Sequence, residues 1–538
     1  MKQHVIRWLA AALALSAACM TGGCRQGAEV GGELTEVTTT GEYPMDTDAE
    51  LRWWLALPLQ VSAYGSSYND SDFARYLEEA TGVKIKFEHP VAGEGEAALN
   101  IMISSGDMPD IVEYNWNSYM GGPDRAINDG IIISIDSYMD KVLPNLKKIY
   151  DETPEWAKQA KSAEGHYYSF PMINESEELD SYVAMFVRQD LLDKAGLEQP
   201  ETLEEWNNVL YTFKEMGIKT PLRISLDTYW QAEVTPFGNP FDYIGTFYHD
   251  KDGNVKFGPY EKDKFTPWVE QMAKWYEDGI IDKEFLDNDN KRYTAMVANG
   301  ENGAIMGSIG GDFGGFLSAI PEGSGIKYTA VGVPTKVKGE IGNWWQKSFD
   351  VDATAPASIS ADSKNKEIAA RVLDFGYSDA GYMLYNFGKE GVSYEIKDGV
   401  PTYTDLITNP DKNGNLTISQ AISKNARASF WGPFVRSVDY IHQFYSTAEQ
   451  TDALKKTASN AFDYKYPNIS LEEKDAKRYN DIITAVDTYR AETISQIIAG
   501  KKPLEDMAEY YEQLKALGIE EAIELKQKAY DKYIAAID

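Results

Sequence analysis

The chain has 538 residues, 43% of them hydrophobic, and a formal net charge of −32 at pH 7. A charge this negative excludes nucleic acids and anionic lipid headgroups as partners held by the general electrostatic field of the protein. The length predicts two lobes, because a single hydrophobic core stops growing at about 250–300 residues.

The N-terminus has the pattern of an export signal. A basic segment, Met1–Arg7, precedes the uncharged apolar segment Trp8–Met20, which is shorter than the ~20 residues of a membrane-spanning helix. Two glycines then precede Cys24, an arrangement similar to a bacterial lipobox, in which the cysteine is lipidated and becomes the mature N-terminus. We therefore expect residues 1–23 to be a lipoprotein signal peptide and Cys24 to carry the lipid.

The lipidation site has a second candidate, since Leu15–Cys19 also fits the lipobox loosely, and an ordinary cleaved signal with incidental cysteines is the alternative to both. Residues 24–48 are rich in glycine, threonine and acidic residues and lack apolar periodicity, so they are expected to form a flexible linker. The chain has two cysteines, and lipidation of one excludes a disulfide. The protein is thus expected to be lipid-anchored at the extracellular face of a bacterial cell membrane.

The first ordered segment is expected to alternate strands with helices. Strand and helix periodicities follow one another over about sixty residues, and such β-α-β-α-β alternation is typical of a parallel sheet covered by helices. The predicted elements are a strand at Leu51–Leu57, a helix at Asp72–Thr81, a strand at Val83–Phe87, a helix at Glu94–Ser105 and a strand at Asp110–Val112.

Helix start signals recur downstream. Thr202 with Glu205 three residues later predicts a capping box, and Thr266-Pro267 predicts the start of another helix. Ser470 with Glu473 predicts a second capping box, from which the chain is expected to be nearly all helical.

Catalytic and metal patterns have little support. No two of the five histidines stand three or four residues apart, and no G-x-S-x-G elbow or phosphate loop is present. Asp250–Asn254 and Asp411–Asn415 resemble the start of calcium loops but are better interpreted as hairpin turns, and a structural calcium is left open. The sequence therefore predicts no catalytic residue, no metal and no cofactor.

The tryptophans divide into two groups. Trp206, Trp268 and Trp275 stand on helical apolar stripes and are expected in cores. Five others lie in polar, turn-like segments, where a flat apolar face beside amides and carboxylates suits the stacking of a sugar ring. These candidate sugar-binding residues are Trp116, Trp230, Trp344, Trp345 and Trp431.

Several stretches together resemble the family 1 extracellular solute-binding proteins, the LipO-like lipoproteins that feed sugar importers. The matching stretches are Leu99–Asp110, Phe186–Leu197 with Thr202–Trp206, Gly279–Phe285 and Asn386–Gly391. The resemblance implies an α/β fold of the two-lobe type II periplasmic-binding-protein class with a helical C-terminal extension. It implies three crossings between lobes and a ligand cleft at the hinge.

The expected lobe division is 49–171 with 309–356 for the first lobe, and 172–308 with 357–538, including the C-terminal helices, for the second. The resemblance places ligand-binding residues in the loop from Glu113 to Trp116, at the crossing, in a glycine-rich loop and near Trp431. The further residues that it implies are Asn174, Glu175, Asp312 and Phe313, with Glu175 and Asp312 bonded to sugar hydroxyls.

The function that this predicts is a lipid-anchored oligosaccharide-binding protein, not an enzyme, that delivers its ligand to ABC transporter permease subunits by hinge closure. The membrane is contacted through the lipid anchor only. The alternatives are a secreted glycan-cleaving enzyme and a glycan sensor or adhesin without a transport role.

Overall fold

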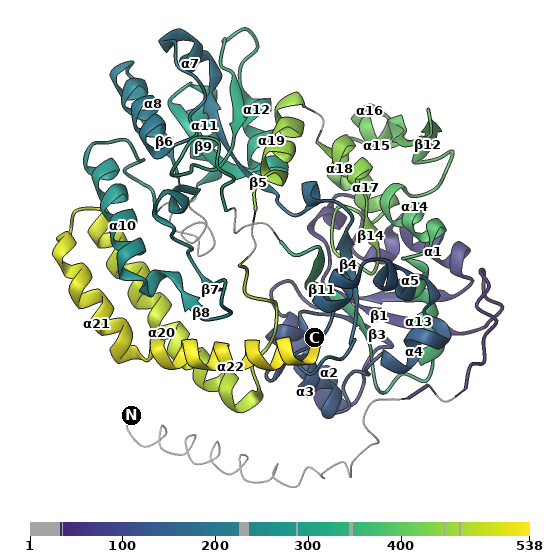
Figure 1. Cartoon of the computed structure of the whole chain (residues 1–538). Coiled ribbons are helices and arrows are strands. Elements are labelled where there is room, and N and C mark those ends of the chain that lie inside the picture. Colours follow the sequence, from purple (N-terminus) through teal and green to yellow (C-terminus); the bar gives the residue numbers. More distant parts are fainter. Residues whose placement is uncertain are drawn as a thin grey trace, which may run out of the picture.

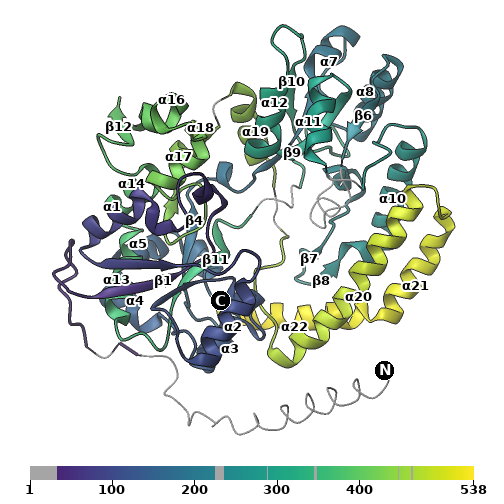
Figure 2. The same cartoon turned by 180° about the vertical axis from the view of Figure 1, so that it is seen from behind.

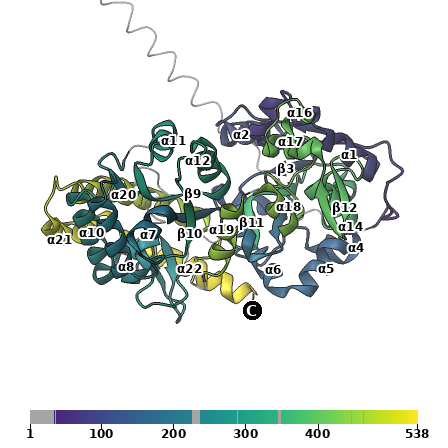
Figure 3. The same ribbon diagram turned by 90° about the horizontal axis from the view of Figure 1, so that it is seen from above.

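The protein has two lobes, each built on its own β-sheet (Figure 1). The computed structural model describes residues 33–34, 36–224, 236–286, 289–343, 348–445, 447–461 and 464–537. Seen from above, the lobes lie side by side, with strand β11 and helix α19 close to the boundary between them (Figure 3).

The first lobe contains a six-stranded sheet in the order β14-β4-β11-β3-β1-β2. Strand β1 pairs in parallel with β2 and with β3, which confirms the predicted parallel alternation, whereas β11 is antiparallel to β3 and β4. The strands are β1 (Glu50–Trp54), β2 (Lys84–Glu88), β3 (Ile111–Glu113), β4 (Phe170–Asn174), β11 (Val351–Ile359) and β14 (Val435–Arg436). The helices around this sheet are α1 (Asp72–Thr81), α2 (Gly95–Ser105), α3 (Gly122–Asn128), α4 (Asp136–Val142), α5 (Pro144–Glu152), α6 (Pro154–Gln159), α13 (Lys366–Phe375) and α14 (Asp379–Phe387).

Local signals explain why helix α1 has the bounds that the sequence predicts. The hydroxyl of Ser71 accepts a hydrogen bond from the Ala74 N–H at 3.1 Å and so caps the first turn. Gly82 ends the helix in the left-handed conformation, at φ 77°, which glycine adopts without strain. Phe73 and Leu77 on the inner face are fully buried.

The second lobe contains a four-stranded sheet in the order β10-β5-β9-β6, with a separate hairpin of β7 and β8. The hairpin turns at Asp250–Asn254, as predicted. The strands are β5 (Val183–Arg188), β6 (Thr220–Arg223), β7 (Phe247–His249), β8 (Val255–Phe257), β9 (Asn302–Ser308) and β10 (Tyr328–Val331). The helices are α7 (Gln189–Ala195), α8 (Leu203–Glu215), α10 (Lys262–Glu277), α11 (Asn290–Ala298), α12 (Gly314–Ala319) and α19 (Ala448–Ala458).

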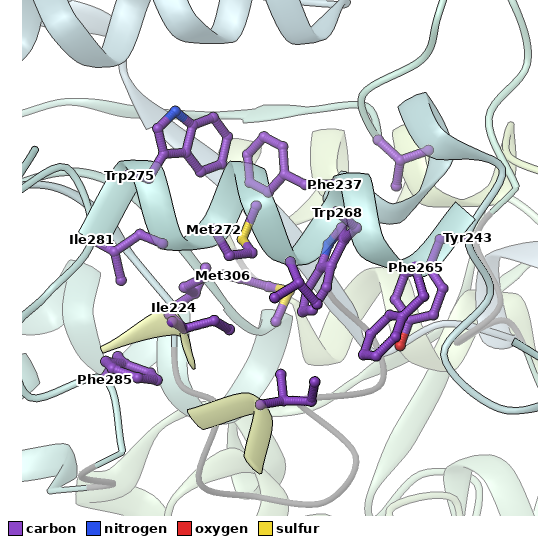
Figure 4. Close-up of a cluster of buried hydrophobic side chains, with 14 of the residues drawn as sticks. Ile224, Phe237, Tyr243, Phe265, Trp268, Met272, Trp275, Ile281, Phe285 and Met306 are labelled. Carbon is purple, nitrogen blue, oxygen red and sulfur yellow. The ribbon is translucent and has the colours of Figure 1, made fainter. Parts of the chain in front are cut away.

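The second-lobe core confirms the prediction for the helical tryptophans. Trp206, Trp268 and Trp275 are at most 2% exposed. Trp268 and Trp275 project from α10 into an apolar cluster with Phe237 and Met272 (Figure 4). The predicted capping box of Thr202 with Glu205 starts α8. Helix α10, however, starts at Lys262 rather than at Thr266, and its proline lies inside the helix.

Three C-terminal helices cover the outer side and base of the second lobe: α20 (Glu473–Ile498), α21 (Met507–Leu517) and α22 (Ile519–Ile537) (Figure 2). The end of α22 reaches the first lobe, where the Tyr533 hydroxyl donates to the Lys158 carbonyl at 3.0 Å. The predicted capping box at Ser470 is wrong. The Ser470 hydroxyl instead donates to Asn117 in the first lobe, and Glu472 occupies the cap position.

The lobe division differs from the expected one in two segments. Strand β10 lies within 309–356 but pairs with β5 of the second sheet. Helices α13 and α14 and strand β14 lie within 357–538 but belong to the first lobe. The chain still crosses between the sheets three times, after β4, after β10 and before α19. Strand partners far apart in the chain decide this division, and no local pattern encodes them.

A subdomain beside the first lobe contains the remaining elements. Here Asp411–Asn415 forms the end of a short helix and a left-handed turn at Gly414, so the predicted hairpin turn is wrong at this position. The elements are β12 (Tyr394–Lys397), β13 (Val400–Tyr403), α15 (Asp405–Thr408), α16 (Pro410–Asn413), α17 (Ile418–Asn425) and α18 (Val438–Phe444). Within the described part of the chain, no helix combines the length and apolarity that a membrane crossing needs.

Candidate functional site

A cavity of about 1150 Å³ lies between the lobes. The loop Leu55–Gln60 lines it from the first lobe, directly after β1, together with Glu113 at the end of β3. Ligands of open α/β sheets bind in this position, outside the carboxyl ends of the strands. The lining from the second lobe includes Phe247 of the hairpin and Lys526 of α22.

Large apolar side chains are exposed inside this cavity. Leu59 is 87% exposed, Tyr182 57% and Trp431 45%, and all three line the same space. Large apolar side chains that stay exposed in a cavity are typical of a binding surface. The cavity therefore offers apolar faces beside polar groups, which is the composition of a small-molecule site.

Trp431 is held in place by hydrogen bonds at both ends. Its indole Nε1 donates to Asp352 Oδ2 at 3.1 Å, and its carbonyl accepts from Arg427 Nε at 2.8 Å. Neighbouring Gly432 lies against Arg427, where an added Cβ would be 2.5 Å from the guanidinium Nε. The indole is thus oriented by its partners while much of its surface stays open to the cavity.

Glu113 of the cavity wall forms a buried ion pair with Arg427, which lies behind it. Nη2 of Arg427 lies 2.6 Å from both carboxylate oxygens of Glu113, and the Trp53 indole donates to the same carboxylate at 2.8 Å. Burial raises the pKa of Glu113, and the nearby guanidinium opposes that rise. A cation satisfies this wall carboxylate from inside the protein, so it is not a free general base.

Cationic groups gather at the second-lobe side of the cavity. Lys465 and Lys526 line it there, and Arg436 of β14 lines it from the first lobe. The Lys526 ammonium lies 4.3 Å from the ring centre of Tyr466, with two further rings within 6 Å. Burial lowers the pKa of Lys526 to about 8, and burial also lowers that of Lys465 to about 8 against the opposing charges of Asp180 and Asp352.

The sequence profile described as "Bacterial extracellular solute-binding protein" matches residues 61–383. That span is more than half of the chain. The protein belongs to this family.

Named relatives agree with this assignment. This solute-binding protein is similar to the fructooligosaccharide ABC transporter substrate-binding protein FusA of Streptococcus pneumoniae, at 25% identity over 87% of this chain and 88% of the relative. It is also similar to lipoprotein LipO of Bacillus subtilis, at 24% identity over 63% of this chain and 66% of the relative. The solved structure of FusA in complex with kestose shares the fold, with a TM-score of 0.67 at 21% identity, over 90% of this chain and 99% of that one. The expected two-lobe solute-binding fold is thereby confirmed.

Among the described candidates from the sequence, Trp431 lines the cavity of this solute-binding protein. Trp116 does not, because it is fully buried in an apolar cluster beside β3, so the expectation of an open ring face at this position is wrong. The polar neighbours along the chain suggested an open position, but the rings of Tyr114 and Tyr119 pack edge-on against the indole. Four candidates, Cys24, Trp230, Trp344 and Trp345, lie outside the described residues.

The candidates at the crossing have partners within the protein. Glu175 accepts hydrogen bonds from the Tyr382 hydroxyl at 3.0 Å and from the Val438 N–H at 2.6 Å. Asn174 is buried and donates to Asp180, which lines the cavity. The structure therefore places these two behind the cavity wall, at the first crossing of the chain between the lobes.

The glycine-rich loop forms a π-helical turn, Ile309–Phe313, between β9 and α12. Asp312 accepts from the Ser308 N–H and hydroxyl at 3.0 Å, and Phe313 is buried and stacks on Phe186 with ring centres 3.4 Å apart. Neither lines the cavity. Gly310 lies against Tyr445, where an added Cβ would be 2.7 Å from the ring, so the glycine allows the backbone to approach this ring closely.

One group among the described residues has metal-ligating potential. The ligand atoms of Asp124, Glu164 and His166 lie within 4.8 Å of one another, in the first lobe and away from the cavity. Ser162 donates to Asp124, Asp136 bonds to His166 at 2.8 Å, and the Lys532 ammonium donates to Glu164 at 2.8 Å, so protein partners already hold all three side chains.

Sequence reasoning missed Leu59, Tyr182 and Lys526. For Leu59 a signal was available, because the segment after the first strand of a parallel sheet lies at the edge where ligands bind. For Lys526 no signal was available, since it is one of several lysines on a long polar helix. Only the packing of α22 against the hairpin and α20 brings it to the cavity.

Proposed function

We propose that this protein binds an oligosaccharide between its lobes and presents it to an ABC importer. The observation that carries the proposal is the cavity between the two lobes, lined by the exposed Leu59, Tyr182 and Trp431 next to charged groups. Apolar ring faces stack on the C–H face of a sugar while polar groups bond its hydroxyls. The similarity to FusA, which is named for fructooligosaccharides, supports a ligand of the same chemical class.

Binding without cleavage is the second part of the proposal. The cavity carboxylates Glu113, Asp180 and Asp352 each have a donor in the protein: the Arg427 guanidinium, the Asn174 amide and the Trp431 indole respectively. A glycosidase needs one carboxylic acid and one carboxylate positioned on either side of the bond that breaks. The partners of these three groups favour a structural or binding role instead.

The test combines calorimetry with solution scattering on the purified protein and a panel of oligosaccharides. We expect a micromolar or tighter dissociation constant, about −8 kcal/mol, for at least one sugar. Saturation should shrink the radius of gyration and raise the melting temperature, because a ligand held by both lobes stabilises the closed state. A bound sugar that changes neither quantity argues against capture by hinge closure.

Two further measurements separate the rivals. Chromatography of the sugar after long incubation should show no product, whereas shortened products would indicate a glycan-cleaving enzyme. Deleting the gene should abolish uptake of the bound sugar by the cell, whereas unchanged uptake would favour a sensor or adhesin.

Attachment to the membrane is proposed to occur through Cys24. The basic segment, the short apolar segment and the glycines before Cys24 support a lipoprotein signal, and LipO of Bacillus subtilis is named as a lipoprotein. An anchored position outside the cell membrane would keep the protein close to the permease that receives its ligand.

A further inference from the structure

The ammonium of Lys526 lies in an aromatic pocket at the second-lobe side of the cavity. Its Nζ is 4.3 Å from the ring centre of Tyr466, 5.1 Å from that of Tyr479 and 5.7 Å from that of Phe247. All four residues line the cavity. Ring faces stabilise a cation electrostatically, but an ammonium has three N–H donors for which an oxyanion is the stronger partner.

No hydrogen bond or ion pair to the Lys526 ammonium is found within the described ranges, 33–34, 36–224, 236–286, 289–343, 348–445, 447–461 and 464–537. The neighbouring Lys465 differs, because the charges of Asp180 and Asp352 act on it. The chain carries a net charge of −32, so a cation without an acidic neighbour is unusual for this protein.

The carboxylates that line the cavity have partners other than Lys526. The buried guanidinium of Arg427 neutralises Glu113, and Asp352 accepts from the Trp431 indole at 3.1 Å. Asp180 accepts from the Asn174 amide at 3.1 Å, and Asp180 and Asp352 also act on Lys465, so each of the three carboxylates has a partner other than Lys526. The second-lobe side keeps a cation next to ring faces, a combination that suits an acidic sugar, because its ring stacks and its carboxylate pairs with the ammonium.

We infer that the second-lobe side of the cavity is a subsite for a carboxylate-bearing sugar residue, with Lys526 as its counter-ion and the partly exposed ring of Tyr479 as its stacking face. The inference rests on the proposed function and specifies its ligand as an acidic oligosaccharide. Burial already lowers the pKa of Lys526 toward neutrality, and an anionic ligand would restore the proton.

A structural role for Lys526 makes a different prediction. If the ammonium only clamps the three rings together, replacing it would lower the melting temperature and weaken charged and neutral ligands alike. A counter-ion for the ligand would instead affect the charged ligand alone.

The experiment compares matched pairs of sugars on the full chain. Trigalacturonate is paired with its methyl ester, a glucuronic-acid-substituted xylotriose with xylotriose, and sialyllactose with lactose. Calorimetric titrations are run on the wild type, on Lys526→Met and on the control Lys477→Met, which removes an exposed charge from α20.

In at least one pair we expect the acidic sugar to bind at least about tenfold more tightly than its neutral partner. One charge-assisted hydrogen bond supplies enough free energy for this difference. Lys526→Met should abolish that preference and leave the neutral partner unchanged, while Lys477→Met keeps it. Raising the salt concentration should reduce the preference, since salt screens the attraction.

Two results would overturn the inference while leaving the proposed function in place. In the first result, no acidic sugar binds, or each acidic sugar binds no more tightly than its neutral partner. The other is an acidic preference that survives in Lys526→Met. A protein that binds no oligosaccharide at all contradicts the proposed function itself, and the inference with it.

Discussion

Nη2 of Arg427 lies 2.6 Å from both carboxylate oxygens of Glu113, and the two side chains are almost fully buried. They belong to segments more than 300 residues apart. Glu113 ends β3 at the cavity, and Arg427 begins the turn that carries Trp431. The pair therefore fixes the ring of Trp431 relative to the sheet. Removing either partner would leave an uncompensated charge in the interior.

The first prediction concerns this pair. Glu113→Gln should lower the free energy of unfolding of the first lobe by about 3–5 kcal/mol, because Arg427 stays buried without its counter-ion. Glu79→Gln is the matched control, since Glu79 pairs with Arg75 and Lys389 on the surface, where such ion pairs contribute little to stability. Scanning calorimetry checks both variants. Equal melting temperatures for the two would contradict a structural role for the buried pair.

The second prediction concerns Trp431. Trp431→Ala should weaken oligosaccharide binding by about 1–3 kcal/mol, by analogy with the stacking of bases on aromatic side chains. The melting temperature of the free protein should change little, because 45% of the side chain is already exposed. Trp206→Ala is the opposite control and should cost about 3–5 kcal/mol of stability through a core cavity. Unchanged affinity in Trp431→Ala would remove this ring from the site.

The third prediction concerns Trp116, which the structure moves from the candidate site to a core. Trp116→Ala should destabilise the first lobe by about 3–5 kcal/mol, since the ring is fully buried among apolar side chains. Affinity measured well below the melting temperature should stay close to that of the wild type. A stable variant with weakened binding would return Trp116 to the ligand site.

The fourth prediction concerns pH. The Lys526 ammonium faces the phenols of Tyr466 and Tyr479, with Lys465 in the same cavity, and Asp531 and Tyr530 of α22 act on Tyr466. Burial raises the pKa of Tyr466, so that phenol stays neutral when Lys526 titrates at about 8. Affinity for an acidic sugar should therefore be constant well below pH 8 and fall about tenfold between pH 7 and pH 9.

The free energy of unfolding depends on the same titration, but it rises with pH over the range in which the affinity falls. The unfolded chain keeps this proton to about pH 10.5, so the free protein gains stability from Lys526 as the pH rises above 8. Titrations of Lys526→Met separate its contribution from that of Lys465, whose pKa burial also lowers to about 8. An affinity profile that is flat in the wild type would contradict the assignment of the ammonium to the ligand.

The fifth prediction concerns the anchor. Cys24→Ala should release the protein from the membrane fraction or leave its signal unprocessed, because stable anchoring needs more than one acyl chain and these are attached at the modified cysteine. Fractionation and metabolic labelling with a radioactive fatty acid measure this. Normal labelling of Cys24→Ala with loss in Cys19→Ala would move the site to Cys19.

The sequence by itself determined the features that depend on neighbours along the chain. The bounds of α1 follow from Ser71 and Gly82 at its ends, and the start of α8 follows from Thr202 and Glu205, three residues apart. The parallel alternation of β1, β2 and β3 and the burial of Trp206 on its helical stripe were likewise readable from local periodicity. Capping bonds and apolar periods act over a few residues, so the sequence alone displays them.

The tertiary structure decided everything that depends on partners far along the chain. Ser470 was expected to cap a helix, but its hydroxyl donates to Asn117 in the other lobe. Polar neighbours suggested an open Trp116, yet the fold buries the ring, and only packing brings Lys526 to the cavity. In each case the local sequence allows several environments with similar free energies, and contacts between distant segments select one of them.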